Sequence, residues 1–320
     1  MRIAFKGRLA LLLAAALPLP ALAQFPAKPI TFIVPFAAGS ATDQIGRAIG
    51  QGVTEQTGQA VVIENKPGAS AMIGAAAGAR AAPDGYTVLI TTNTTHAANE
   101  HLYKSLTYDP VKDYAPLTLL GKGGQIMVVN PASPAKTVGE FLAQARQQPG
   151  KLSFGSGSSS SRIAGELLQQ MANVQLLHVP YKSNPLAITD LLGGQIDMMI
   201  TDTATGLPQV KSGKLRALGV TGTARSALAP DVPTIAEAGQ KGFDMGSWQA
   251  VFAPAGTPKA IVDRLHAEIM KIVATPEVQA RLKSFGMIPS TMTPAELGAY
   301  QKAEVAKWAQ VIKAAGIKAD

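Results

Sequence analysis

Two loops of small residues, each between a short apolar strand and an amphipathic helix, are the segments of this sequence best suited to bind a ligand. The first runs from Pro35 to Asp43 behind the apolar residues 30–34, and the second from Gly155 to Arg162 behind residues 152–154. Where such a loop enters a helix, backbone N–H groups lack intrahelical partners and the helix dipole adds partial positive charge. Each loop therefore predicts an anion site.

The first loop contains residue types that favour close contact with a ligand. Gly39 permits a near approach of the backbone, while Ser40 and Thr42 offer hydroxyl donors. Asp43 fits an N-cap or an acid of the first helical turn. A strand-to-helix turn with a structural role alone is the alternative for this segment.

The second loop is richer in hydroxyl groups. Four consecutive serines, Ser158 to Ser161, stand where helix N–H groups need partners or a ligand. Arg162 follows in the first turn, where a cation opposes the helix dipole unless an anion lies nearby or the side chain turns to solvent. The sequence is compatible with either arrangement of Arg162.

Other polar residues follow apolar strands, at the ends where open α/β sheets bind ligands. Asp202 could contact a ligand or cap the next turn, and residues 91–96 form a polar rim that includes His96. His96 and His178 could donate to a ligand or serve as structural hydrogen-bond partners. Tyr181 could form a wall of the cleft or pack in the core.

The sequence contains no motif that identifies an enzyme or a metal site. The serine loop lacks the G-x-G-x-x-G spacing, no glycine-rich run precedes a Walker lysine, and no G-x-S-x-G elbow is present. Four scattered histidines and no cysteine give no metal-ligand spacing. We therefore predict no catalytic residue, metal or cofactor. An exported serine hydrolase that uses Ser158 or Ser159 is the alternative, and it requires a histidine within hydrogen-bond distance.

The N-terminus has the pattern of a signal peptide. Basic residues precede the apolar run 9–17, and the Ala-Leu-Ala sequence at 21–23 fits a cleavage site, so residues 1–23 are predicted to be removed. Loss of three basic residues reduces the net charge from +8 to about +5. The remaining basic residues are scattered, which argues against nucleic acid as a partner. These features predict an exported protein.

Strand-like runs alternate with helical patterns through most of the chain, which predicts an α/β fold with a mostly parallel sheet. The strand-like runs are 30–34, 60–64, 87–91, 126–129, 152–154, 196–200 and 215–220. Helix starts are indicated at Thr137, Asn184, Thr257, Thr275 and Thr293. We expect two lobes joined by two crossings, with the ligand between them. The predicted boundaries are 24–124 with 225–320 for lobe 1 and 125–224 for lobe 2.

Several short segments, taken in order, resemble the Bug family of periplasmic solute-binding proteins, the receptors of tripartite tricarboxylate transporters. They extend over essentially the whole chain after the leader and include PAKPITFIVPFAAGSATD, VVIENKPGA, AAPDGYTVL, YDPVKDYAPLTLL, LLHVPYK, GKLRALGVT, LAPDVPTIAEAG and FAPAGTP. Each segment alone is a weak signal. Their shared order makes the resemblance specific.

This resemblance implies a two-lobed Venus-flytrap fold that closes on a small mono-, di- or tricarboxylate, aromatic acids included. Backbone amides and small hydroxyls of the two loops would hold the carboxylate. The implied binding residues are Ala38, Gly39, Ser40, Thr42 and Asp43 in lobe 1 and Ser156, Ser158, Ser159 and Ser160 in lobe 2, with Thr94 and Asp202 beside the distal part of the ligand. Arg162 and Tyr181 complete the set of candidates.

Two departures from the family pattern affect these expectations. Ala37 and Ser40 stand where family members often have proline and a second glycine, and Arg162 stands where histidine is frequent. The resemblance also implies a monomer that delivers its ligand to the membrane subunits of the transporter. A ligand sensor for a signalling receptor is a further alternative, which the sequence does not separate from a transport receptor.

Overall fold

The computed structural model describes residues 25–319, and the predicted leader, residues 1–23, lies outside this part. The strands are β1 (Ile30–Val34), β2 (Val61–Asn65), β3 (Thr87–Thr92), β4 (Tyr114–Val129), β5 (Ser153–Ser156), β6 (Leu177–Pro180), β7 (Met198–Asp202), β8 (Arg216–Val220), β9 (Gly246–Pro254) and β10 (Met287–Pro289). The α-helices are α1 (Ala41–Thr57), α2 (Met72–Ala79), α3 (Asn99–Leu102), α4 (Val138–Gln147), α5 (Ser159–Ala172), α6 (Asn184–Leu192), α7 (Thr203–Lys211), α8 (Lys259–Val273), α9 (Pro276–Ser284) and α10 (Pro294–Ala314). A short π-helix, η2 (Thr94–Ala98), precedes α3.

The strands form one curled sheet in the order β2-β1-β3-β9-β4-β7-β5-β6, and β8 and β10 also pair with β4. Strand β1 is parallel to β2 and β3, and β5 is parallel to β6 and β7. The pairs β3–β9, β4–β9, β4–β7 and β4–β8 are antiparallel. The prediction of a mostly parallel sheet was therefore wrong, because β4 and β9 run against their neighbours at the centre.

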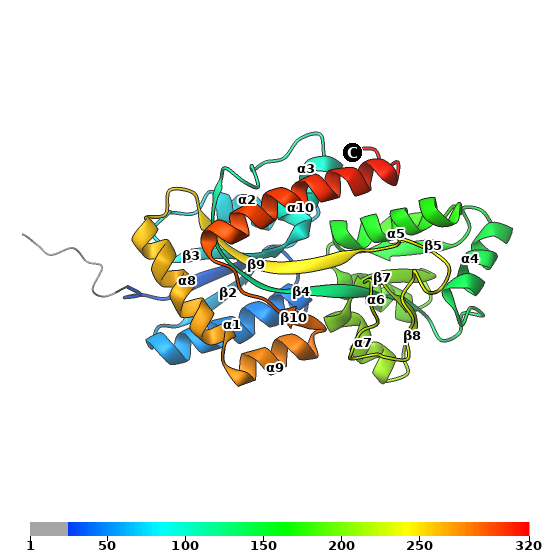
Figure 1. Cartoon of the computed structure of the whole chain (residues 1–320), viewed down its shortest axis with the longest axis horizontal. Helices are drawn as coiled ribbons and strands as arrows, with labels where there is room; N and C mark the ends of the chain where they lie inside the picture. Colours follow the sequence, from blue (N-terminus) through cyan, green and yellow to red (C-terminus); the bar gives the residue numbers. More distant parts are fainter. Residues whose placement is uncertain (1–24, 320) are drawn as a thin grey trace, which may run out of the picture.

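Strand β4 connects the two lobes. It pairs with β9 over Tyr114–Gly124 and with β7 over Gln125–Val129. Strand β9 lies beside it, with Ser247 opposite Gly123, so the two crossings are hydrogen-bonded neighbours. Figure 1 shows both strands running along the long axis of the molecule between the lobes. The predicted boundary at residues 124 and 125 falls inside β4 and stays a prediction.

Apolar residues at the predicted helical and strand spacings build the cores of the lobes. One cluster packs α1 and α8 against β1, β3 and β9, and a second packs α6 and α7 against the β4–β7–β8 region. A third, larger cluster extends across both lobes and includes Trp248 and Trp308, which are 1% and 3% exposed. Helix α10 packs against η2, β4, α3 and α5, so the C-terminal helix contacts both lobes (Figure 1).

Most helix starts lie where the sequence indicates them. Thr137 and Thr275 cap α4 and α9, and Thr293 forms a full capping box with Glu296 at the start of α10. Two predictions were displaced by one residue. Ser183, not Asn184, is the N-cap of α6, and α8 has Pro258 as its N-cap because the Thr257 hydroxyl donates to the Pro254 carbonyl at 2.8 Å.

Candidate functional site

The loop between β1 and α1 ends at a capped helix N-terminus. Ser40 is the N-cap, and its hydroxyl accepts a hydrogen bond from the Asp43 N–H at 3.2 Å. Gly39 has φ +80°, a left-handed conformation that favours glycine. The N–H groups of Ala41 and Thr42 precede the first intrahelical bond, which Gln44 makes to the Ser40 carbonyl. Both groups can therefore donate to a ligand.

Asp43 lies in the first turn of α1 and holds this loop together. Its carboxylate accepts hydrogen bonds from the Gly39 N–H at 2.9 Å, Asn65 Nδ2 at 3.0 Å and Arg47 Nε at 3.0 Å. Burial would raise the pKa of Asp43, but these hydrogen bonds outweigh burial and lower the pKa below its ordinary value of 3.8. The ionised carboxylate therefore has hydrogen-bond partners on the loop, on α1 and on β2.

The serine loop has the same construction in the second lobe. Ser158 is the N-cap of α5 and accepts a hydrogen bond from the Ser161 N–H at 3.2 Å. Its hydroxyl also lies 3.1 Å from that of Ser160. The Ser159 hydroxyl donates to Asn99 Oδ1, which belongs to α3 of the other lobe, at 2.6 Å.

The two helix N-termini open into one hollow between the lobes, which we call the central cleft. Its volume is about 30 Å³. This is room for about two water molecules in the arrangement that the structure describes. The lining residues are Phe36, Ser40, Ala41, Thr42, Thr92, Asn93, Gln125, Ser158, Ser160, Asn184, Asp202, Ser247 and Gln249.

Asp202 is at once a helix cap and part of the cleft wall. It is the N-cap of α7, where Oδ1 accepts from the Thr205 N–H at 3.0 Å and the Thr205 hydroxyl at 2.9 Å. Asn184 Nδ2 donates to Oδ2 at 2.7 Å, and Asn184 Oδ1 accepts from the Gly157 N–H at 3.0 Å. Asn184 thus ties the serine loop to Asp202. Desolvation raises the pKa of Asp202 against the effect of these hydrogen bonds.

A second hollow, the side chamber, shares Ser158 with the central cleft and has a volume of about 190 Å³. Both lobes line it, and its residues are Ser70, Tyr103, Ser156, Ser158, Ser159, Arg162, His178, Pro180 and Tyr181. The Ser156 hydroxyl lies 2.7 Å from His178 Nε2, and the Tyr181 hydroxyl donates to Asp190 at 2.7 Å. The side chamber therefore brings one cation, Arg162, near the cleft.

The structure brings together most of the residues expected at the site. Ser40, Thr42, Ser158, Ser160 and Asp202 line the central cleft, and Ser156, Ser159, Arg162 and Tyr181 line the side chamber. The other four candidates do not line either hollow: Ala38 and Gly39 are exposed on the loop, Asp43 is turned into the loop, and Thr94 is fully buried.

His96 belongs to the core and not to the rim of the cleft. Its ring is fully buried and stacks on Phe252 with ring centroids 4.0 Å apart, while Tyr114 lies against it at 4.5 Å. Nδ1 lies 2.8 Å from the Thr95 hydroxyl. Burial lowers the pKa of His96 to about 3, so the ring is neutral at physiological pH.

Sequence reasoning missed several residues of the central cleft. Gln125 and Gln249 come from β4 and β9, and Phe36, Asn184 and Ser247 were not considered as ligand contacts. Asn93 was included only as a member of the polar segment 91–96. The polar residue that interrupts each apolar strand, Gln125 before 126–129 and Gln249 before 250–253, is the signal that could have identified the two glutamines.

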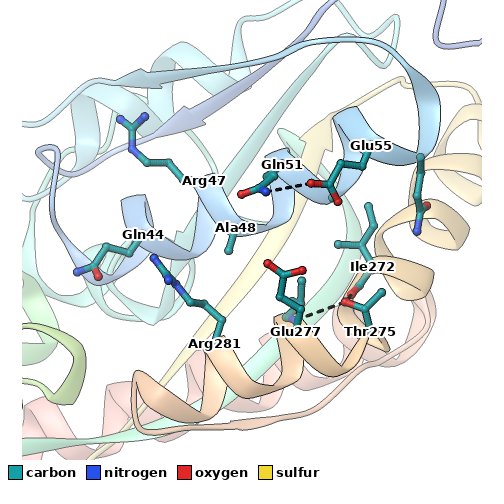
Figure 2. A pocket seen from close by; sticks show the side chains of 12 residues that line it. Gln44, Arg47, Ala48, Gln51, Glu55, Ile272, Thr275, Glu277 and Arg281 are labelled. Carbon is teal, nitrogen blue, oxygen red and sulfur yellow. Dashed lines mark hydrogen bonds between the residues drawn. The ribbon is translucent and has the colours of Figure 1, made fainter.

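A third hollow of about 340 Å³ lies outside the cleft, between α1 and α9. Figure 2 shows Arg47 and Arg281 near one end and Glu55 and Glu277 farther along, with Gln51 hydrogen-bonded to Glu55. These four charged side chains are exposed and of both signs. This groove therefore lacks the buried polar side chains that line much of the central cleft.

Within residues 25–319, no cluster of three or more histidine and acidic side chains is arranged to hold a metal ion. No helix in the same part of the chain has the length and apolar character needed to cross a membrane. The hydroxyls of Ser158 and Ser159, the serines considered for a hydrolase, are engaged with Ser160 and Asn99.

Known proteins resemble this chain over nearly its full length. A protein encoded in the tcbD–tcbE intergenic region of Pseudomonas sp. strain P51 is 40% identical over 291 residues, covering 90% of this chain and 86% of the relative. Among solved structures, R. palustris Rpa4515 with adipate superposes with a TM-score of 0.90 at 32% identity, covering 92% of this chain and 100% of that one. The periplasmic binding protein BugD superposes with a TM-score of 0.88 at 34% identity and the same coverage.

These neighbours include a periplasmic binding protein and a protein with adipate bound, and their similarity agrees with the two-lobed fold. The profile of the tripartite tricarboxylate transporter receptor family matches residues 45–317. The chain therefore belongs to the tripartite tricarboxylate transporter receptor family, the solute receptors that its sequence resembles.

Proposed function

We propose that this protein is a periplasmic receptor that binds a small carboxylate in the central cleft and delivers it to the membrane subunits of a tripartite tricarboxylate transporter. The predicted signal peptide, residues 1–23, would direct its export, and the receptor would act as a monomer without a cofactor. Binding alone, and no catalysis, is the activity proposed.

One observation carries this proposal: the N-termini of α1 and α5, one from each lobe, open into the same cleft. Unpaired N–H groups and aligned peptide dipoles attract an anion at each helix end. Serine and threonine hydroxyls beside them add donors, and hydrogen bonds to a charged acceptor are stronger than those between neutral groups. A carboxylate has two oxygens, so each lobe can bind the same group.

Closure of the lobes would link binding to delivery. A ligand held by donors from both lobes stabilises the closed state over the open one by its difference in affinity for the two. The membrane subunits would then recognise the closed receptor. Uptake of a bound acid by cells that carry the transporter, compared with cells lacking this receptor, tests delivery.

Thermal unfolding of residues 24–320 with a panel of mono-, di- and tricarboxylates tests the binding function. A ligand present at one hundred times its Kd adds about 2.7 kcal/mol to the free energy of unfolding and raises the Tm. A panel in which no acid changes the Tm at millimolar concentration would contradict the proposal.

A substitution at the first residue of α1 tests the role of the backbone. Ala41→Pro removes one N–H from the cleft, and proline is favoured at this helical position. Ser40 has φ −64° and ψ 160°, which suits the residue before a proline. We expect binding to weaken about tenfold, the loss of one hydrogen bond to a charged group. Lys259→Pro, at the first residue of α8, is the matched control outside the cleft.

If the Ala41→Pro variant folds and binds the ligand with unchanged affinity, the N-terminus of α1 is not part of the binding site. If this variant does not fold, Thr42→Val tests the same terminus, because it removes only the hydroxyl that lines the cleft.

A further inference from the structure

Part of the wall of the central cleft is built from carboxamide and carboxylate side chains, each of which carries a hydrogen-bond acceptor. It consists of Asn93, Gln125, Asp202 and Gln249, which we call the acceptor wall. We infer that the ligand carries only one carboxylate; this inference rests on the proposed function. The second polar group of the ligand is then a neutral or cationic hydrogen-bond donor, which the acceptor wall binds. A carboxamide, a hydroxyl or an ammonium group has this chemistry.

Strand pairing explains why these four residues are neighbours. Thr92, which precedes Asn93, lies opposite Gln249 in the β3–β9 ladder. Gln125 lies opposite Asp202 in the β4–β7 ladder. Because β9 and β4 are themselves adjacent, the two pairs form one surface from residues far apart in the sequence.

The carboxamides of this wall are buried and lack partners. Asn93, Gln125 and Gln249 are 0%, 1% and 7% exposed. Asn93 Oδ1 and Nδ2, Gln125 Oε1 and Gln249 Oε1 make no hydrogen bond. A buried polar atom without a partner costs about 1–3 kcal/mol, and a ligand group that supplies a donor recovers this loss. The three oxygens without partners can accept from N–H or O–H groups of a ligand, and a carboxamide or hydroxyl oxygen of the same ligand can accept from Asn93 Nδ2.

Asp202 adds negative charge to the same wall. Its Oδ1 already accepts two hydrogen bonds, whereas Oδ2 accepts one, from Asn184, and retains capacity for another donor. A second carboxylate placed here would meet a like charge in a desolvated cleft, which is unfavourable. A donor group would instead gain a charge-assisted hydrogen bond.

No cation compensates for this charge. The thirteen residues that line the central cleft, all in the described part of the chain, include no lysine, arginine or histidine. The helix N-termini of α1 and α5 can neutralise one carboxylate. Arg162 lies in the side chamber, beyond Ser158, and does not line the acceptor wall.

Matched pairs of ligands test this inference. Succinate, glutarate and adipate differ from their monoamides, succinamate, glutaramate and adipamate, only in whether the second group is a carboxylate or a carboxamide. Terephthalate and 4-carbamoylbenzoate form an aromatic pair. The affinities are measured by calorimetry on residues 24–320 at pH 7. We expect the best monoamide to bind at least about tenfold tighter than its diacid. Butyrate, valerate, hexanoate and benzoate are the corresponding acids without a donor, and we expect them to bind weakly.

Asp202→Asn removes the charge, and it also replaces the Oδ2 acceptor of the Asn184 hydrogen bond by an amide donor, so the measured quantity is the ratio of monoamide to diacid affinity within the variant. Asparagine is as good an N-cap as aspartate, so α7 should remain capped. We expect the preference for the monoamide over the diacid to fall at least about fivefold in this variant. Gln249→Met removes an acceptor without changing the charge, and it should weaken monoamide binding by a larger factor than binding of the monocarboxylate that lacks a donor.

The outcomes separate the inference from the proposed function. A diacid that binds more tightly than its monoamide, with no change in the ratio on Asp202→Asn, would overturn the inference and leave the carboxylate receptor intact. Failure of every acid in the panel to bind would overturn both.

Discussion

The Ser159 hydroxyl donates a hydrogen bond of 2.6 Å to Asn99 Oδ1. Ser159 begins α5 in one lobe, Asn99 begins α3 in the other, and both side chains are buried. Asn99 Nδ2 in turn donates to the Ser70 carbonyl at 2.9 Å. The Ser159 hydroxyl therefore makes a buried hydrogen bond between the two lobes beside the cleft.

We predict that Asn99→Leu shifts the protein toward an open arrangement. The substitution leaves the buried Ser159 hydroxyl without its acceptor, which costs about 1–3 kcal/mol in the closed state. The radius of gyration from small-angle X-ray scattering should rise, and ligand affinity should fall by about tenfold.

Ser159→Ala is the partner in a double-mutant cycle. Because the two residues act through one hydrogen bond, the double variant should lose less affinity than the sum of the single losses. Additive losses would show that the bond does not couple the lobes.

Ser158→Ala should weaken both α5 and the binding site. Loss of an N-cap hydroxyl costs about 1 kcal/mol of stability, and here it also removes a donor that lines the cleft. Thr137→Ala is the matched control, since Thr137 caps α4 by accepting from the Glu140 N–H at 3.1 Å and does not line the cleft. Chemical denaturation should show similar destabilisation for both variants, and calorimetry should show weaker binding only for Ser158→Ala. If Ser158→Ala binds the ligand as tightly as the original protein does, Ser158 is not part of the binding site.

His96 should make stability fall as the solution is acidified. In the folded protein its pKa is lowered from 6.5 to about 3, so between these values the unfolded chain binds a proton that the folded chain excludes. The contribution of His96 to the free energy of unfolding is complete above pH 6.5 and is lost as the pH falls toward 3, by up to about 1.4 kcal/mol per pH unit.

The variant His96→Leu removes the titrating group and keeps a buried side chain of similar size. Urea denaturation at pH 7, 6 and 5 should show a flatter pH dependence than for the original protein. A slope as steep as before would mean that another group causes it.

Gly157 allows the serine loop to pack against α6. A Cβ at this position would overlap the backbone of Ser183 and Asn184, which cannot move away as a flexible side chain could. Gly157→Ala should therefore destabilise the fold by several kcal/mol or displace the loop and abolish binding. Gly139→Ala, in the first turn of α4 with its nearest neighbour 3.9 Å away, is the control and should raise stability by up to about 1 kcal/mol. A Gly157→Ala variant with normal stability and binding would contradict this reading of the loop.

The parts of the fold that were predictable are those specified by nearby residues. Thr293, Pro294 and Glu296 form the start of α10 by contacts within one helical turn, and the same holds for Thr275 and Thr137. Both loop-to-helix units were recognised for this reason. Asn184 was misassigned because Ser183 and Asn184 are both acceptable caps, and tertiary hydrogen bonds from Gly157 and to Asp202 occupy the asparagine side chain.

The centre of the sheet was not predictable in the same way. Strand β9 and the first part of β4 contain glycine and proline, and their pairing joins Gly123 to Ser247 across more than a hundred residues. The serines and threonines of the two loops were found because they adjoin helix starts, whereas Ser247 on β9 was missed. Gln125 and Gln249 were missed because only long-range pairing places them in the cleft.

Strands β4 and β9 form a two-stranded ribbon that is both the connection between the lobes and the floor on which Gln125 and Gln249 stand. A molecule bound to these glutamines therefore contacts the connection between the lobes itself. Bending of the ribbon would tilt both carboxamides together, so the angle between the lobes and the fit of the ligand are set by the same few peptide units.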